Sequence, residues 1–163
     1  MRTRLIVRML VINERDEVLL IQHEEAVAVD QKQPDPLLEW AAPGGGLEEY
    51  ENYEEAAVRE LREETGITDA AIGPWMWTSE RVVANGGEYV RRYGRYHLVS
   101  VGDPAVSFAH IEGAERPVFK DIRWWTLAEL RERLDIVLLP CLPELVAPIL
   151  AGRLPESPLT LPW

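Results

Sequence analysis

The chain has 163 residues, 47% of them apolar and 28% charged, a composition that fits one soluble globular domain and excludes a disordered or fibrous protein. Its 28 acidic and 17 basic residues give a net charge of −11 at pH 7, which disfavours binding to a polynucleotide. The apolar runs are shorter than the roughly 20 residues of a membrane-spanning helix, and Arg8 interrupts any secretory signal, so we expect neither. The single cysteine, Cys141, favours a reducing cytoplasm.

Strands and a glycine-rich loop are predicted for the N-terminal third of the chain. Apolar stretches indicate strands over residues 4–13 and 17–23, joined by the turn sequence Asn13-Glu14-Arg15-Asp16. Residues 24–38 are polar and contain two prolines, so we expect a loop there. The sequence Pro43-Gly44-Gly45-Gly46 suits neither a helix nor a strand and predicts a second irregular segment.

A helix is predicted over residues 53–65. Asn52 can cap its first turn together with Glu55, three residues later, and Gly66 suits the position after its last turn. Further elements are expected in the order strand 75–84, strand 88–101, strand 119–125, helix 127–134 and a last helix between 143 and 152, before an irregular Pro-rich tail over 153–163. We interpret residues 1–163 as a single α+β domain with a mixed sheet flanked by helices.

Acidic residues concentrate just before and within this helix, with eight glutamates between residues 48 and 64. Glu60, Glu63 and Glu64 stand at i, i+3 and i+4, so their carboxylates project from one side of the helix and repel one another. A hard divalent cation such as Mg²⁺ would convert that repulsion into binding, because it prefers oxygen ligands. A solvated acidic helix face is the alternative that composition alone leaves open.

The same stretch resembles a known sequence motif. Gly45, Glu51 and Arg59-Glu60-Leu61-Arg62-Glu63-Glu64-Thr65-Gly66-Ile67 fill every fixed position of the Nudix box, GX5EX7REUXEEXGU, in which U is aliphatic. Residues 7–22, 40–45 and 123–127 also look like the segments that flank this box in the family. The chain is therefore identified as a member of the Nudix hydrolase family.

The resemblance implies an α/β/α sandwich and a metal-dependent hydrolase of nucleoside diphosphates linked to another group. It implies Mg²⁺, with Mn²⁺ as an alternative, and a small nucleotide-like substrate. By position, the implied metal ligands are Glu60, Glu63, Glu64, Glu51 and the Gly45 carbonyl, with Arg59 as an orienting partner. Two alternatives stay open: hydrolysis of a non-nucleotide diphosphate, and a sensor that binds a nucleotide without cutting it.

The general base is less well defined by the motif. Glu60 or Glu64 could take the proton from the attacking water, but many family members use a glutamate in a loop before the last strand. Where that glutamate would fall, this chain has Pro117 and Val118, so we select Glu115 as the nearest candidate for a distal ligand or base. A solvated loop glutamate is the competing interpretation.

A substrate-facing wall is expected on the strand over residues 88–101. Tyr89, Arg91, Tyr93, Arg95 and His97 alternate and therefore share one face. Arg91, Tyr93 and Arg95 are our candidates for substrate binding, because guanidinium groups match phosphate oxygens and a tyrosine can stack on a base. The same alternation also suits solvent or a homodimer interface. On the preceding strand, Trp75 and Trp77 are expected to share a face as well.

Overall fold

The strands of this protein form one mixed sheet. The computed structural model describes residues 1–25, 37–85, 87–107, 119–133 and 139–162, and seven strands of this part pair in the order β3-β2-β1-β5-β4-β7, with β6 on β2. The strands are β1 (Arg2–Ile12), β2 (Val18–Glu25), β3 (Leu37–Ala41), β4 (Ala71–Asn85), β5 (Glu88–Ser100), β6 (Phe119–Trp125) and β7 (Leu159–Thr160). β1 runs parallel to β5, whereas β1 with β2 and β4 with β5 are antiparallel.

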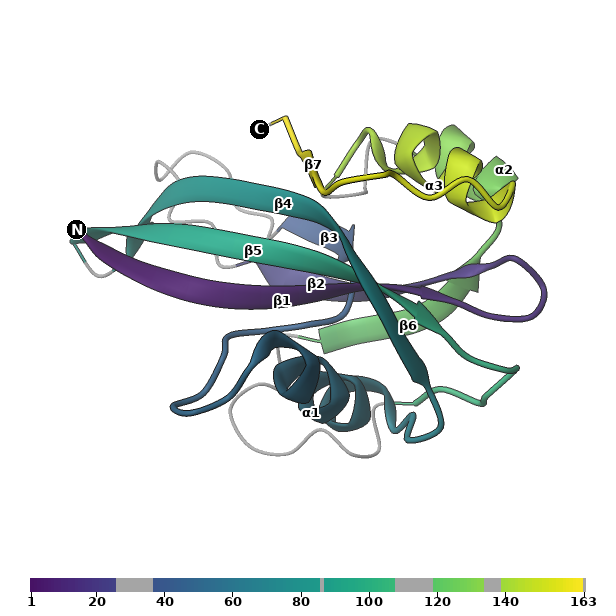
Figure 1. Ribbon diagram of the computed structural model, residues 1–163, viewed down its shortest axis with the longest axis horizontal. Coiled ribbons are helices and arrows are strands. Elements are labelled where there is room, and N and C mark those ends of the chain that lie inside the picture. Colours follow the sequence, from purple (N-terminus) through teal and green to yellow (C-terminus); the bar gives the residue numbers. More distant parts are fainter. Residues whose placement is uncertain (26–36, 86, 108–118, 134–138, 163) are drawn as a thin grey trace.

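Helices cover both faces of the sheet and make an α/β/α sandwich (Figure 1). Helix α1 (Tyr53–Thr65) lies on one face, and α2 (Leu127–Glu132) and α3 (Leu142–Leu150) lie on the other. Each face has its own apolar core, and burying a large side chain in it stabilises the fold by about 1.5–3 kcal/mol. The core on the α1 face includes Val7, Met9, Val11, Ala57 and Leu61, and the core on the α2/α3 face includes Leu10, Leu20, Trp77, Leu130 and Val146.

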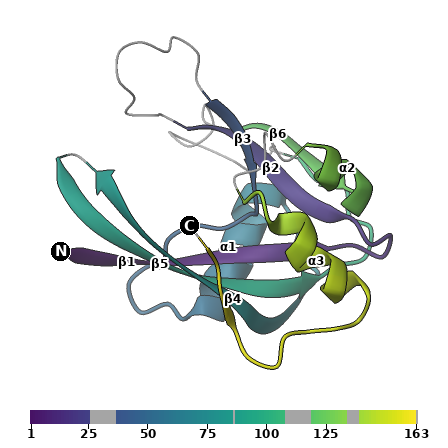
Figure 2. The ribbon, with the colours of Figure 1, turned by 90° about the horizontal axis from the view of Figure 1, so that it is seen from above.

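A split in the sheet positions the functional site. β1 and β2 pair at Ile12 and Val18, but further along β2 pairs with β3 and β6 instead, and the two strands diverge (Figure 2). The glycine-rich loop occupies the edge of β1 that this divergence leaves open. There the backbone N–H groups of Val7 and Met9 donate to the carbonyls of Gly45 and Pro43, at 2.9 Å each.

The strand over 119–125 and the helix over 53–65 have the bounds that the sequence predicts. The loop expected over 24–38 is wrong at both ends, because residues 24–25 belong to β2 and residues 37–38 to β3. The tail is not wholly irregular, since β7 pairs with β4 and Leu161 is buried. None of the described helices is long and apolar enough to cross a membrane.

Candidate active site

Local sequence signals place the carboxylate-bearing helix α1. The Asn52 side chain accepts a hydrogen bond from the Glu55 N–H, and the Glu55 carboxylate accepts one from the Asn52 N–H, each at 2.9 Å, which completes the predicted capping box. Gly66 ends the helix with a left-handed φ of 76°, which suits glycine. Leu61 is buried in the core on the α1 face, so the side of α1 that carries Glu60 and Glu64 is held beside the glycine loop.

A cleft of about 600 Å³ opens between this helix, the glycine loop and the sheet. Its volume lies within the range of small-molecule sites. The wall formed by α1 carries the three predicted carboxylates, and the sheet contributes arginines from β1 and β5 to the lining. The lining residues used below are Glu60, Glu63, Glu64, Gly44, Gly45, Gly46, Arg59, Arg4, Arg8 and Arg92.

Arg59 is the centre of an ion-pair network at this wall. Its guanidinium donates from Nε and Nη2 to the two carboxylate oxygens of Glu51, at 2.8 and 2.9 Å, in the bidentate geometry that suits arginine. Nη1 donates to Glu60 at 2.9 Å and to Glu63 at 3.2 Å, and Nη2 also reaches the Gly46 carbonyl at 3.0 Å. The structure therefore brings Arg59, Glu51, Glu60 and Glu63 together, and it joins them to the glycine loop.

The glycine loop approaches the carboxylates more closely than a side chain would allow. A Cβ atom at Gly45 would lie 2.3 Å from Oε1 of Glu60. The neighbouring Gly44 N–H donates to the buried carboxylate of Glu64 at 2.8 Å. A backbone hydrogen bond thus holds the Glu64 carboxylate, and the missing side chain of Gly45 leaves room for that of Glu60. The Gly45 carbonyl accepts from the Val7 N–H and, like any carbonyl, has a second lone pair.

The donor set at this wall fits a hard divalent cation. It consists of carboxylate oxygens and a backbone carbonyl, which are the ligands that Mg²⁺ prefers. Within the described ranges no three metal-binding side chains converge on a common point, and the Arg59 guanidinium contacts two of the carboxylates instead. An ion at this wall would therefore share Glu60 and Glu63 with Arg59.

The Glu51–Arg59 ion pair should make the free energy of unfolding depend on pH. Hydrogen bonds from Arg59 lower the pKa of Glu51 from its ordinary 4.5 to about 2 and raise the pKa of Arg59. Because the folded pKa of Glu51 is depressed, the stabilisation is present above pH 4.5 and is lost as the pH falls toward 2. We expect Glu51→Gln to lower the free energy of unfolding by about 1–2 kcal/mol at pH 6 and by less at pH 3. Urea unfolding with EDTA present measures both, and an equal loss at the two pH values would contradict the pairing.

The substrate-binding residues expected on β5 are not at the cleft. The register pairs Arg91 with Thr3 and Arg95 with Val7, which places these side chains and Tyr93 on the α1 face. There Arg91 pairs with Glu80 at 3.3 Å, and the Arg95 guanidinium lies 4.3 Å above the ring of Tyr53. The predicted alternation of this strand is present, but its opposite face, which carries Arg92, meets the cleft.

Three cleft arginines were missed by the sequence reasoning: Arg4, Arg8 and Arg92. Arg8 Nη1 donates to the carbonyls of Ala42 and Gly44, at 2.9 and 3.0 Å, and so supports the glycine loop. The available signal was the spacing of Arg4 and Arg8 on even positions of a strand, which puts both on one face. Glu115, the candidate distal base, lies outside the described residues.

The sandwich thus carries a cleft lined by carboxylates and arginines. Comparison with family models then gives the family: the model described as NUDIX domain matches residues 2–145, and the chain belongs to the NUDIX family. The Nudix box recognised in the sequence is thereby confirmed.

Curated relatives match over a shorter stretch. An RNA pyrophosphohydrolase from Cereibacter sphaeroides is 44% identical over 50 residues, which is 31% of this chain and 31% of the relative. The match thus spans less than a third of that relative's length.

Solved structures match over most of the chain. The Caenorhabditis elegans Ap4A hydrolase in a binary complex has a TM-score of 0.62 and 20% identity, covering 91% of this chain and 98% of the other. The Escherichia coli dihydroneopterin triphosphate pyrophosphohydrolase has a TM-score of 0.62 and 14% identity, covering 91% and 95%. At these identities the two structures show the shared fold, which agrees with the α/β/α sandwich implied by the motif.

Proposed function

We propose that the protein is a Mg²⁺-dependent pyrophosphohydrolase, with Mn²⁺ as an alternative, that cleaves a phosphoanhydride bond in a nucleotide-like metabolite. The observation that supports this is the cleft that carboxylates from α1 and arginines from the sheet line together. A diphosphate is negatively charged and would be repelled by the carboxylates alone. Guanidinium groups and a divalent ion supply the opposite charge, so the carboxylates and arginines together suit an anionic substrate at a metal site.

The carboxylates of Glu60, Glu63 and Glu64 and the Gly45 carbonyl would hold the ion, with Glu51 acting through Arg59. When bound, such an ion supplies positive charge that acidifies a coordinated water and polarises a phosphoryl oxygen. Arg59 keeps the Glu60 and Glu63 carboxylates oriented toward the cleft.

A carboxylate oxygen of Glu60 or Glu64, or of Glu115, takes the proton of the attacking water. Arg4, Arg8 and Arg92 face the phosphate oxygens from the sheet side of the cleft. We propose these arginines for substrate binding in place of Arg91, Tyr93 and Arg95.

Removing Arg92 tests the sheet side of the cleft. We expect Arg92→Ala to raise KM about tenfold with a smaller change in kcat, because a charge-assisted hydrogen bond to a phosphate is made in the ground state as well as in the transition state. Steady-state kinetics measures both constants. Arg131→Ala, which removes an exposed arginine from α2, is the control for the change in net charge. An unchanged KM in Arg92→Ala would remove Arg92 from the proposed binding set.

Release of phosphate or pyrophosphate tests the function as a whole. The panel contains nucleoside triphosphates, ADP-ribose, nucleotide sugars, dinucleoside polyphosphates, non-nucleotide diphosphates and, given the local similarity to an RNA pyrophosphohydrolase, an RNA with a 5′-triphosphate. Glu63→Gln serves as the blank. We expect metal-dependent release that is absent in the blank. Phosphate or pyrophosphate release from non-nucleotide diphosphates alone would make these compounds the substrate class. Nucleotide binding without such release would favour a sensor.

A single domain over residues 1–163, a cytoplasmic location and a homodimer stay predictions. Size-exclusion chromatography with light scattering tests the last of them.

A further inference from the structure

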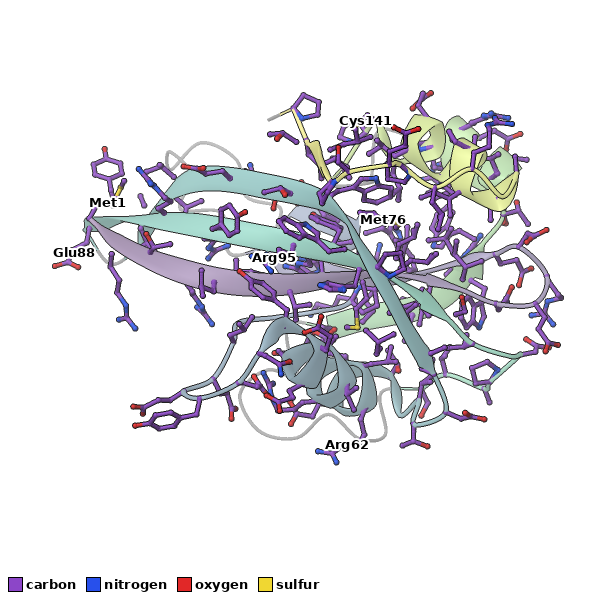
Figure 3. All side chains as sticks on the ribbon, in the orientation of Figure 1. Met1, Arg62, Met76, Glu88, Arg95 and Cys141 are labelled. Carbon is purple, nitrogen blue, oxygen red and sulfur yellow. The ribbon has the colours of Figure 1, made fainter. Side chains whose placement is uncertain are left out.

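The Arg95 guanidinium lies against two aromatic rings on the α1 face of the sheet. It is 4.3 Å from the ring centroid of Tyr53, the first residue of α1, and 4.0 Å from that of Trp75 on β4. Arg95 comes from the middle of β5, above helix α1 in the view of Figure 3. Because a planar cation is attracted to the faces of aromatic rings, these contacts join the start of α1 to β4 and β5. We call Arg95, Tyr53 and Trp75 the arginine stack.

Neighbouring contacts hold both rings of the arginine stack in place. The Trp75 indole N–H donates to the Trp77 carbonyl at 2.9 Å. The Tyr53 ring also stacks against that of His97, with 6.4 Å between the ring centroids and 25° between the ring planes. His97 is buried, and its Nδ1 lies 3.2 Å from the Gly73 carbonyl oxygen. The stack is therefore built into the fold and is not a contact between freely exposed side chains.

Stability alone does not explain an arginine at position 95. The Arg95 Nε is buried and has no hydrogen-bond partner among the described residues. A buried N–H group without a partner lowers the stability of the fold, and the penalty is larger for a charged group. An apolar side chain of similar length would contact the rings without that penalty. What arginine adds is a rigid, charged plane that contacts both rings at once and so gives Tyr53 a defined position.

The position of Tyr53 sets the position of the carboxylates on α1. Glu60 and Glu64 follow Tyr53 at i+7 and i+11, so the three side chains lie along one side of the helix. Ala57, between them on the same side, is fully buried in the core of the α1 face. Holding the Tyr53 ring against the sheet therefore fixes the rotation of the helix about its axis and its position along that axis.

The glycine loop is attached to the sheet at the same level. The parallel register places Arg95 of β5 opposite Val7 of β1, and the Val7 N–H donates to the Gly45 carbonyl at 2.9 Å. Gly45 in turn lies against Glu60, since a Cβ atom there would be 2.3 Å from Oε1. Contacts from Arg95 therefore reach both sides of this close approach, the loop through Val7 and the carboxylate through Tyr53.

From this arrangement we infer that Arg95 is a positioning residue that sets the place of the Glu60 carboxylate relative to the Gly45 carbonyl through the ring of Tyr53. This inference rests on the proposed function, in which these two groups hold the divalent ion. Arg95 is not among the described residues that line the cleft, so it acts through the helix and not on the substrate. Groups that orient metal ligands in this way typically contribute about 10–100-fold to metal affinity or activity.

Metal binding gives a readout without turnover. Calorimetric titration of the full chain with Mn²⁺ alone measures the affinity of the carboxylates and the glycine loop. We expect Arg95→Met, which keeps the length of the side chain without its plane and charge, to weaken Mn²⁺ binding about tenfold. Tyr53→Leu should have the same effect, and Tyr53→Phe, which keeps the ring, should bind as the wild type does. Arg91→Met is the matched control, because Arg91 lies two residues earlier on the same face of β5 and pairs with Glu80.

Steady-state kinetics with Mg²⁺ separates positioning from substrate binding. On the compound of the panel that the wild type cleaves best, we expect kcat of Arg95→Met to fall about 10–100-fold with an unchanged KM. Arg95→Lys keeps the charge without the plane and should recover part of kcat. The double variant Arg95→Met/Tyr53→Leu should lose no more than the more impaired single variant, because both changes remove one contact. Thermal melts verify folding, and if Arg95→Met does not fold, Arg95→Lys and Tyr53→Leu decide the test.

The outcomes separate this inference from the proposed function. Wild-type Mn²⁺ affinity and kcat in the folded variants at residues 95 and 53 would overturn the inference and leave the function in place. A raised KM with unchanged kcat would also overturn it, because Arg95 would then contact the substrate. Turnover of no compound would overturn the function, and the Mn²⁺ titration would then decide the inference alone. If the wild type bound no Mn²⁺ either, both would be wrong.

Discussion

Glu64→Gln and Glu60→Gln are each expected to lower kcat by about 10²–10⁴-fold, the range that general acid–base and electrostatic groups contribute. Glutamine has the shape of glutamate, and its amide oxygen can still accept the hydrogen bond that Gly44 donates to residue 64 at 2.8 Å. The substitution therefore removes the negative charge and proton-accepting capacity while keeping the local geometry. Initial rates with Mg²⁺, on the compound of the panel that the wild type cleaves best, measure the effect.

Glu54→Gln is the matched control for these two variants. Residue 54 lies on the same helix, but its side chain is exposed and is not part of the cleft lining. It should retain wild-type kcat, and thermal melts should show that all three variants fold. Wild-type turnover in both Glu60→Gln and Glu64→Gln would contradict the proposed mechanism. A loss of turnover in Glu54→Gln as well would show that the charge of the helix matters rather than the cleft.

The parts of the site that the sequence predicts are those encoded by neighbouring residues. The capping box of Asn52 with Glu55, the left-handed Gly66 and the i, i+3, i+4 spacing of the carboxylates all lie within one helix. Such signals need no knowledge of the rest of the chain. The helix accordingly begins and ends at the predicted residues, and its carboxylates share the cleft with Gly45.

Elements that depend on distant partners were predicted less well. β3 follows a stretch of polar residues and prolines, and its strand conformation is supported by pairing with β2, from Ile21 to Glu25. β7 is only two residues long and exists as a strand through its contact with Trp77 and Thr78 of β4. Neither segment has a local pattern strong enough to indicate a strand without those partners.

The sequence also could not predict which face of a strand meets the cleft. Alternation alone places Arg91 and Arg92 on opposite faces, but which face lies at the site depends on the glycine loop joining the edge of β1. A register shift between Trp75 and Trp77 also changes which face of the sheet a side chain occupies. Trp75 contacts Arg95 on the α1 face, whereas Trp77 is buried in the core on the α2/α3 face, so the expectation of a shared face was wrong.

Gly45→Ala is expected to impair catalysis while leaving the fold nearly intact. The new Cβ would lie 2.3 Å from Oε1 and 2.6 Å from Cδ of Glu60, so this carboxylate must move away from the glycine loop. The carboxylate is the far end of a flexible side chain in the cleft lining and can shift at small cost, so the loss of unfolding free energy should stay within about 1 kcal/mol. Displacing a catalytic group by about 1 Å can cost 10²-fold in rate, and we expect kcat to fall by about that factor.

Gly44→Ala, one residue earlier, should instead impair the stability of the fold more than Gly45→Ala does. Gly44 has a φ of 135°, which an L side chain rarely adopts, and its Cβ would lie 2.2 Å from the backbone oxygen of Val7. Backbone strain and overpacking add up to a loss of about 3 kcal/mol or more in unfolding free energy.

Urea unfolding and kcat, measured on both glycine variants, test the two expectations. If Gly45→Ala kept wild-type kcat, the contact between Gly45 and Glu60 would have no catalytic role, and the proposed metal wall would lose its backbone support. If instead Gly44→Ala were as stable as the wild type, the glycine loop would not be packed tightly against β1.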